Sequence, residues 1–408
     1  MSRETKQIIG TIAEPHLFAR GAIQNFALFK SGFRAFFFCG PVFVVVAILY
    51  FILFMSGAVS VFPSAWDIIS WHRHEMIFGY AGAIIIGFLF TAVPNWTGHP
   101  TPKDILLGFI VFLWLVGRIV VFTSSYIPSW LVAFIDISFF LVCAAGILPA
   151  LVKSKNKRNY FFIFLLLLLA IANGITHYYN ADVNYNNDVG IRFGLNIVII
   201  IMIILGGRVI PFFTERPLGL TIVRNKYIER LSLAFAILAL ITDTIGMKGI
   251  FPGFLFAIAA VINALRLYKW NSLKTFSIPL LWVLHAGYAW LVAAFALRAL
   301  YNLGISMPYS IATHAFTTGG IGVLTIGMMA RVSLGHSGRI LAVGKPMLVS
   351  FICINLAAIV RVFGVLLFPN FTMYWLEITS LFWVLAFCIF IWIYTPILVF
   401  LNMDSRVG

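Results

Sequence analysis

Long apolar segments alternate with short polar stretches along the whole chain. Twelve of the apolar segments are roughly 20 residues long, the length that an α-helix needs to cross the hydrocarbon core of a bilayer. Pieces rich in Gly, Pro, Asn, Asp or Lys separate them. The pattern predicts an all-α, polytopic membrane protein with about twelve transmembrane helices, at residues 34–56, 72–94, 104–123, 129–152, 159–180, 190–213, 228–247, 250–268, 277–301, 308–332, 346–368 and 374–402.

The composition supports this prediction. Hydrophobic residues make up 62% of the 408 residues and charged residues only 10%, whereas a soluble domain carries about 25% charged residues. Each of the four cysteines stands alone in an apolar run, with no CxxC pair. That pattern argues against a structural disulfide, a thiolate cluster and covalently attached haem.

Basic residues are distributed unevenly between the two sides of the predicted bundle. The side of the N-terminus carries 22 of the 28 Lys and Arg residues, and the other side carries six. Because cytoplasmic loops are enriched in Lys and Arg, both termini are expected in the cytoplasm. The net charge of +15 is then a matter of topology, with anionic membrane lipid as the expected electrostatic partner and no nucleic acid.

This orientation divides the chain into three parts. We expect a cytoplasmic N-terminal segment at residues 1–33, a single twelve-helix membrane domain at residues 34–402 and a cytoplasmic tail at residues 403–408.

Five histidines fall within the predicted helices. The orientation places His72, His74, His177 and His314 in the outer leaflet and His285 about 8 residues into its helix, or ~12 Å deep at 1.5 Å per residue. Ionisable groups at membrane depth are costly, so they usually face the bundle interior and mark a site. Imidazole ligands in an apolar setting suit haem iron and copper, and haem b requires no covalent attachment motif.

His72 and His74 open the second predicted helix next to Glu75. Two residues apart on a regular helix, they point about 200° away from each other. They can share one metal only if the backbone is irregular there, and otherwise they serve two sites. Glu75 is a candidate to orient an imidazole or to carry protons. The alternative is an interfacial belt anchored by Trp71.

The other candidates each carry a simpler alternative. His314 is flanked by small residues that leave room for a planar ligand, or it bonds to a neighbouring hydroxyl. His177 is also compatible with the interface, and His285 with a helix–helix hydrogen bond. Arg208 and Arg331, at inner helix ends, could pair with lipid headgroups or with haem propionates. Three carboxylates inside the predicted helices are weaker candidates for a proton path: Asp136, Asp243 and Glu377.

The second and tenth predicted helices match without gaps at an offset of 240, which pairs His74 with His314 and Gly79 with Gly319. A fainter match relates Arg208 to Arg331. Glycine recurs wherever membrane helices pack closely, so part of the match can arise by chance. A repeat of this kind places sites at pseudo-symmetric interfaces, and helices 2, 6 and 10 would be the equivalent members of three four-helix arcs.

Five long motifs in this chain resemble the NnrS family. They are WHRHEMIFG at 71–79, AVPNWTG at 92–98, GGRVIPFFT at 206–214, HAGYAW at 285–290 and MMARVSLGHSGR at 328–339. The resemblance spans the chain from Phe33 to the last helix. It implies a bacterial inner-membrane protein associated with haem and copper, with denitrification and with defence against nitric oxide.

A weaker similarity is to the haem-copper oxidases and nitric oxide reductases, which also have twelve helices in three arcs. Their low-spin haem is held by histidines of helices 2 and 10, and His74 and His314 take similar places. The sixth helix of this chain has no histidine, however, and no His-His pair is present. A binuclear centre of the usual layout is therefore not expected.

The resemblance leads to a concrete prediction. The protein reduces nitric oxide to nitrous oxide at a buried haem b in the outer leaflet, with copper as a second candidate cofactor and a quinol or cytochrome as electron donor. His74 and His314 are the predicted haem ligands, and a second metal would draw on His72, His177 and His285. Glu75 and His72 are the candidate catalytic residues, while Arg208 and Arg331 would assist in cofactor binding. The alternatives are a non-catalytic nitric oxide-binding haem protein and a proton-coupled transporter.

Overall fold

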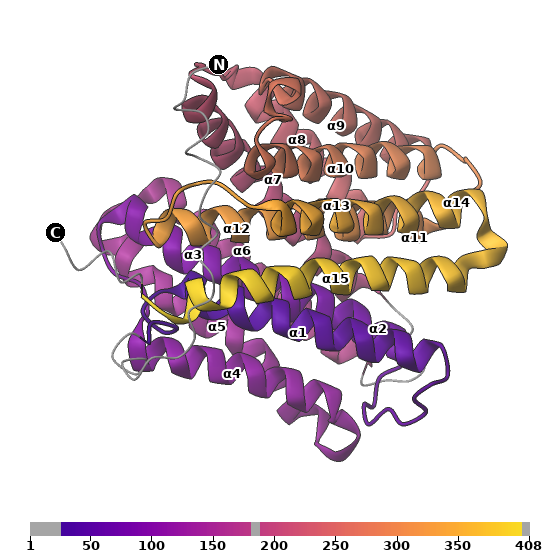
Figure 1. Ribbon diagram of the computed structural model, residues 1–408. Coiled ribbons are helices and arrows are strands. Elements are labelled where there is room, and N and C mark those ends of the chain that lie inside the picture. Colours follow the sequence, from indigo (N-terminus) through magenta and orange to yellow (C-terminus); the bar gives the residue numbers. More distant parts are fainter. Residues whose placement is uncertain (1–25, 181–187, 402–408) are drawn as a thin grey trace.

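The computed structural model describes residues 26–180 and 188–401 (Figure 1). Within these stretches the chain forms helices and no β-strand. Eleven helices are long and apolar enough to cross a membrane, and α8 (Lys226–Thr244) is a twelfth helix that carries several charged residues. The prediction of an all-α membrane protein with about twelve helices is confirmed, and the predicted boundaries differ from the observed ones by at most five residues.

The elements follow the chain in two halves. The first half contains α1 (Gly32–Met55), α2 (Ile68–His74), η3 (Glu75–Ala81), α3 (Gly82–Thr97), α4 (Asp104–Phe122), α5 (Ser129–Lys153), α6 (Phe161–Asn180) and α7 (Val189–Leu218). The second half contains α8, α9 (Ile250–Lys269), the short turn η6 (Ser272–Thr275), α10 (Pro279–Asn302), α11 (Tyr309–His314), η7 (Ala315–Gly322), α12 (Val323–His336), α13 (Lys345–Ile359), η8 (Val360–Gly364), α14 (Val365–Leu367) and α15 (Thr372–Val399).

The second and tenth membrane helices are each built from three elements, and their backbones widen at equivalent positions. Helix 2 consists of α2, η3 and α3, and helix 10 consists of α11, η7 and α12. In both, a regular α-helix ends at a histidine and widens into π-helical turns, which begin at Glu75 and at Ala315. These two starting points lie 240 residues apart, so the sequence repeat extends to the backbone. Such π-helical turns are rare and are frequent at functional sites.

Helix 2, helix 10 and α7, which is helix 6, form the centre of the bundle. Their most apolar windows are 94%, 89% and 67% buried, against 33–56% for the other membrane helices. The Tyr80 hydroxyl lies 2.7 Å from the Thr325 hydroxyl and joins helices 2 and 10 directly. Helices 2, 6 and 10 follow one another at intervals of four helices along the chain. Their shared central position agrees with an arrangement of three arcs of four helices each.

The beginning and the end of the described chain close the bundle. α1 lies beside α15 along most of its length (Figure 1), and the Ala27 amide donates to the Val399 carbonyl at 2.7 Å. The predicted tail at 403–408 and most of the predicted N-terminal segment at 1–33 lie outside the described residues, so the division into three parts stays a prediction.

Local sequence fixes the start of helix 2. The Asp67 carboxylate accepts hydrogen bonds from the amides of Ile69 and Ser70, which satisfies amides that the first helical turn leaves unpaired. The end of the bundle at which α2 and α11 begin is called the α2 end below, and it lies to the right in Figure 1.

Candidate metal centre

Three side chains that can bind a metal meet near the α2 end of the bundle. They are His74 at the end of α2, Asp136 in α5 and His177 in α6, and their ligand atoms lie within 4.8 Å of one another. The Nε2 atoms of both histidines are 2.9 Å from the Oδ2 atom of Asp136. All three are buried, with exposed fractions of 0%, 1% and 7%. The fold thus brings together two of the five predicted histidines.

Asp136 is the centre of a wider hydrogen-bond network. Its Oδ1 atom accepts a hydrogen bond from the Arg118 guanidinium of α4, and its Oδ2 atom accepts one from the Asn173 amide at 2.8 Å. A carboxylate inside a membrane is tolerated when a cation and several donors surround it. Asp136 therefore ties helix 2, α4, α5 and α6 together at one point.

Glu75 completes the network on the side of helix 2. It is fully buried. One carboxylate oxygen accepts from Arg118 at 2.6 Å, and the other lies 3.1 Å from the Nδ1 atom of His74. Both nitrogens of His74 thus face acceptor oxygens, and each can donate a hydrogen bond. An imidazolium and a guanidinium would then balance the two carboxylates, as a buried group of charges requires.

Small and aromatic residues make room for this network. A Cβ atom at Gly79 would lie 2.6 Å from a carboxylate oxygen of Glu75 and 2.9 Å from the Arg118 guanidinium. The Trp66 ring packs edge-on against His74 and His177, with centroids 4.8 and 5.0 Å apart. These contacts fix the directions in which the imidazoles point.

The donor set fits a transition-metal ion. Two imidazole nitrogens and one carboxylate oxygen suit copper, zinc or iron, whereas magnesium and calcium prefer a cluster of oxygens. A metal held by His74, Asp136 and His177 would replace the hydrogen between His74 and Asp136, so its binding would release a proton. Arg118 would fix the position of Asp136 through its hydrogen bond, and Glu75 would do the same for His74.

A second histidine group, formed by His72 and His314, lies at the same end of the bundle, and the basic residue Arg361 belongs to it. The Nδ1 atom of His314 lies 2.7 Å from the Ser310 carbonyl, which only accepts, so Nδ1 carries the hydrogen and Nε2 keeps a lone pair. The His72 ring stacks on Phe51, and its buried Nδ1 atom has no hydrogen-bond partner. The charge of Arg361 acts on both imidazoles, and no described carboxylate forms an ion pair with it.

The two predicted haem ligands belong to these different groups. Among the described residues, no hydrogen bond, ion pair or ring contact joins His74 to His314. The Nε2 atom of His314 keeps the lone pair that an axial haem ligand needs. Both ring nitrogens of His74, by contrast, lie in hydrogen-bond contact with acceptor oxygens. Five residues further along helix 10, Gly319 packs closely against α10, because a Cβ atom there would lie 2.5 Å from the Trp290 ring. The haem-ligand pair stays a prediction.

The comparison with known proteins accounts for the long motifs. The sequence matches the NnrS protein family over residues 27–400, nearly the whole chain. The chain belongs to the NnrS family. No curated protein matches the sequence. Membership of this family fits a nitric oxide-associated membrane haem protein, and the predicted resemblance is confirmed.

The remaining site candidates of this NnrS chain lie away from both histidine groups. His285 bonds through its two nitrogens to the hydroxyls of Ser272 at 2.8 Å and Thr214 at 2.9 Å. This is the helix–helix hydrogen bond that the sequence left open as an alternative to metal binding. His285 also lies near the other end of α10 from the α2 end.

Arg208 and Arg331 also lie toward the end opposite the α2 end. Arg208 donates to the Asn159 amide oxygen at 2.7 Å, and the Arg331 guanidinium stacks 4.1 Å above the Phe213 ring. Arg331 is 17 residues beyond His314, roughly 25 Å along helix 10 at 1.5 Å per residue. That separation argues against a propionate partnership between Arg331 and a haem held by His314.

Sequence reasoning singled out the two histidines of the metal centre and missed part of their surroundings. Asp136 had been a candidate for a proton path, while Arg118 and Asn173 had no assigned role. A usable signal was present, because Arg118 and Asp136 are opposite charges inside two consecutive predicted helices. Both stand near the helix ends that lie on the side of His74.

Proposed function

We propose that this NnrS-family protein holds a transition-metal ion at His74, Asp136 and His177 and takes part in the removal of nitric oxide. The buried three-donor cluster is the observation that carries the proposal. Family membership supports the link to nitric oxide and haem. Nitric oxide is small and neutral and enters lipid, so it can reach a site between membrane helices through the bilayer.

The reaction that we propose is the reduction of two nitric oxide molecules to nitrous oxide and water. It consumes two electrons and two protons, forms one N–N bond and breaks one N–O bond. A quinol or a reduced cytochrome would supply the electrons. A bound metal or haem b would supply an iron or copper atom that binds nitric oxide and passes electrons.

The residues of this chain have distinct roles in the proposal. His74, His177 and Asp136 would hold the metal, and Asp136 would remain paired with Arg118. Glu75 and His74 are in hydrogen-bond contact at 3.1 Å and can hold and transfer protons within the buried network. His314 is the candidate ligand for haem b, because its Nε2 atom keeps a lone pair.

The proposed setting is the bacterial inner membrane, with both termini in the cytoplasm. The structure describes a multi-pass helical bundle, and the excess of Lys and Arg on the side of the N-terminus supports this orientation. The metal centre would then lie in the outer half of the bilayer.

Metal analysis of the detergent-purified full-length protein tests the metal site. We expect bound metal in the wild type and a loss of metal affinity of at least about tenfold in His74→Ala and His177→Ala. His285→Ala is the matched control, because His285 is also buried but bonds only to hydroxyls. A wild type that binds no metal, or a His177→Ala variant that retains full affinity, would contradict the proposal.

The optical spectrum and the turnover of nitric oxide test the reaction. We expect a haem spectrum, changed in His314→Ala, and anaerobic conversion of nitric oxide to nitrous oxide when a quinol is present. Binding of nitric oxide without consumption would favour a non-catalytic protective or signalling protein. A colourless, metal-free protein would favour a proton-coupled transporter that uses the buried charges.

A further inference from the structure

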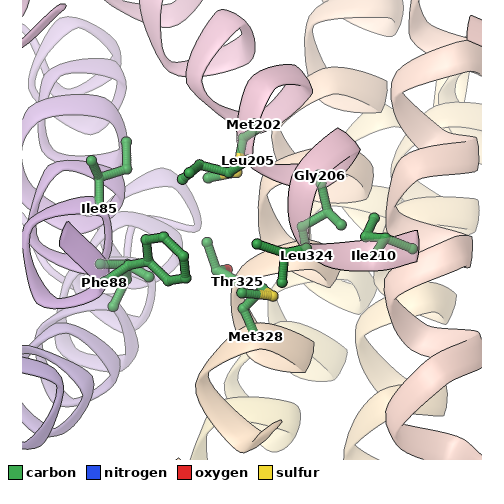
Figure 2. A pocket seen from close by; sticks show the side chains of 11 residues that line it. Ile85, Phe88, Met202, Leu205, Gly206, Ile210, Leu324, Thr325 and Met328 are labelled. Atoms are coloured by element: carbon green, nitrogen blue, oxygen red, sulfur yellow. The ribbon is translucent and has the colours of Figure 1, made fainter. Parts of the chain in front are cut away.

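A cavity lies where the three central helices meet (Figure 2). Its volume is about 40 Å³, so the space suits a few atoms rather than a large cofactor. Side chains of all three helices point into it in Figure 2. The lining residues are Ile84, Ile85 and Phe88 of helix 2, Met202, Leu205, Gly206, Val209 and Ile210 of helix 6, and Leu324, Thr325 and Met328 of helix 10.

The lining follows the internal repeat. The offset of 240 relates all three lining residues of helix 2 to the three of helix 10: Ile84 to Leu324, Ile85 to Thr325 and Phe88 to Met328. The fainter match of Arg208 with Arg331 also pairs Met202 with Thr325 and Leu205 with Met328. The cavity therefore lies at the pseudo-symmetric interface of helices 2, 6 and 10.

The cavity offers no free hydrogen-bonding group from a lining side chain. The one polar side chain is Thr325, whose hydroxyl donates to the Ile321 carbonyl at 2.7 Å and accepts from Tyr80 at 2.7 Å. A buried water needs two to four polar partners, so water is not expected to fill this space. The polarisable thioethers of Met202 and Met328 favour contact with a non-polar molecule.

We propose that this cavity is a binding site for small non-polar gas molecules. Protein interiors usually pack with few voids, and dry apolar cavities in proteins bind xenon. Ile84 lies ten residues beyond His74, roughly 15 Å along helix 2, so the cavity is separate from the metal centre. That nitric oxide is its natural occupant rests on the proposed function, whereas gas binding itself does not.

Xenon is the probe, because it binds without metal, haem or electrons. Crystals of the full-length wild type are exposed to xenon gas, and its anomalous scattering locates the bound atoms. We expect a xenon peak between Ile85, Leu205 and Met328. The absence of a peak there would overturn the proposal, and it would leave the metal and nitric oxide experiments unaffected.

Filling the cavity provides a second test. Leu205→Trp should abolish the xenon peak, while Leu115→Trp, at a site on α4 that is 46% exposed, should retain it. If Leu205→Trp does not fold, Ile85→Phe takes its place, because this substitution fills the cavity from helix 2. A peak of unchanged height in a folded filled variant would contradict the assignment.

Discussion

Asp136 shows how much of the candidate site depends on one carboxylate. It is in contact with Arg118, Asn173, His74 and His177, which come from three other helices. Removing one partner of a buried charge pair leaves the other charge without compensation, and the cost in soluble proteins is about 3–5 kcal/mol. Both the stability of the bundle and the binding of metal should therefore respond to this side chain.

Asp136→Asn keeps the shape of the side chain and removes its charge. We predict that the free energy of unfolding falls by about 3–5 kcal/mol, because Arg118 loses one of its two buried carboxylate partners, and that the variant loses its metal. Denaturant titration of the purified protein and metal analysis measure the two effects.

Asp188→Asn is the matched control for that substitution. Asp188 forms an ion pair with Arg73 in which both side chains are 43% exposed, and exposed pairs contribute at most about 1 kcal/mol. Metal content should remain at the wild-type level. If Asp136→Asn unfolded at the same denaturant concentration as Asp188→Asn, the carboxylate would not have the central role assigned to it.

The sequence predicts single residues of the site better than their grouping. His74 and His177 stand out because histidine is rare inside apolar helices. Whether they meet at Asp136 depends on which face each of helix 2, α5 and α6 turns toward the others. The sequence does not define that face, because these helices are apolar on all sides.

At the scale of elements, the question raised by His72 and His74 is answered by the backbone. The sequence allowed one shared metal only with an irregular backbone, or otherwise two sites. α2 remains regular through His74, and the π-helical turns begin one residue later. The two imidazoles therefore belong to different groups, His74 with His177 and His72 beside His314.

Gly79 lies within those π-helical turns, which contact α4, and its carbonyl accepts a hydrogen bond from the Trp114 indole at 3.0 Å. We predict that Gly79→Ala lowers both stability and metal affinity, because its Cβ would lie 2.6 Å from the Glu75 carboxylate and 2.9 Å from Arg118. Overpacking of this kind typically costs about 1–3 kcal/mol. Denaturant titration and metal binding measure the outcome.

Gly108→Ala on α4 separates this effect from the general effect of alanine on a helix. No atom lies within 4 Å of the Cβ position at Gly108. Since alanine favours a helix over glycine by up to about 1 kcal/mol, this variant should be as stable as the wild type or slightly more stable. Equal behaviour of the two variants would show that Gly79 does not shape the ion-pair network.

At the scale of the whole molecule, the order and number of helices could be predicted because each span must satisfy its own backbone hydrogen bonds. The offset of 240 also indicated which helices are equivalent. The central position of helix 6 was harder to foresee, since only the pair Arg208 and Arg331 related it to helix 10. Its large buried fraction and its share of the cavity lining now support that relation.

The orientation of the whole bundle is the remaining prediction. The loop that contains Val223 is flanked by basic residues, whereas the loop that contains Val61 has none, so the positive-inside rule places Val61 outside the cell membrane and Val223 in the cytoplasm. Both valines are well exposed, at 71% and 82%. In a variant whose four cysteines are replaced, Val61→Cys should react with a membrane-impermeant thiol reagent on intact cells. Val223→Cys should react only after lysis, and the reverse pattern would place the metal centre in the inner half of the bilayer.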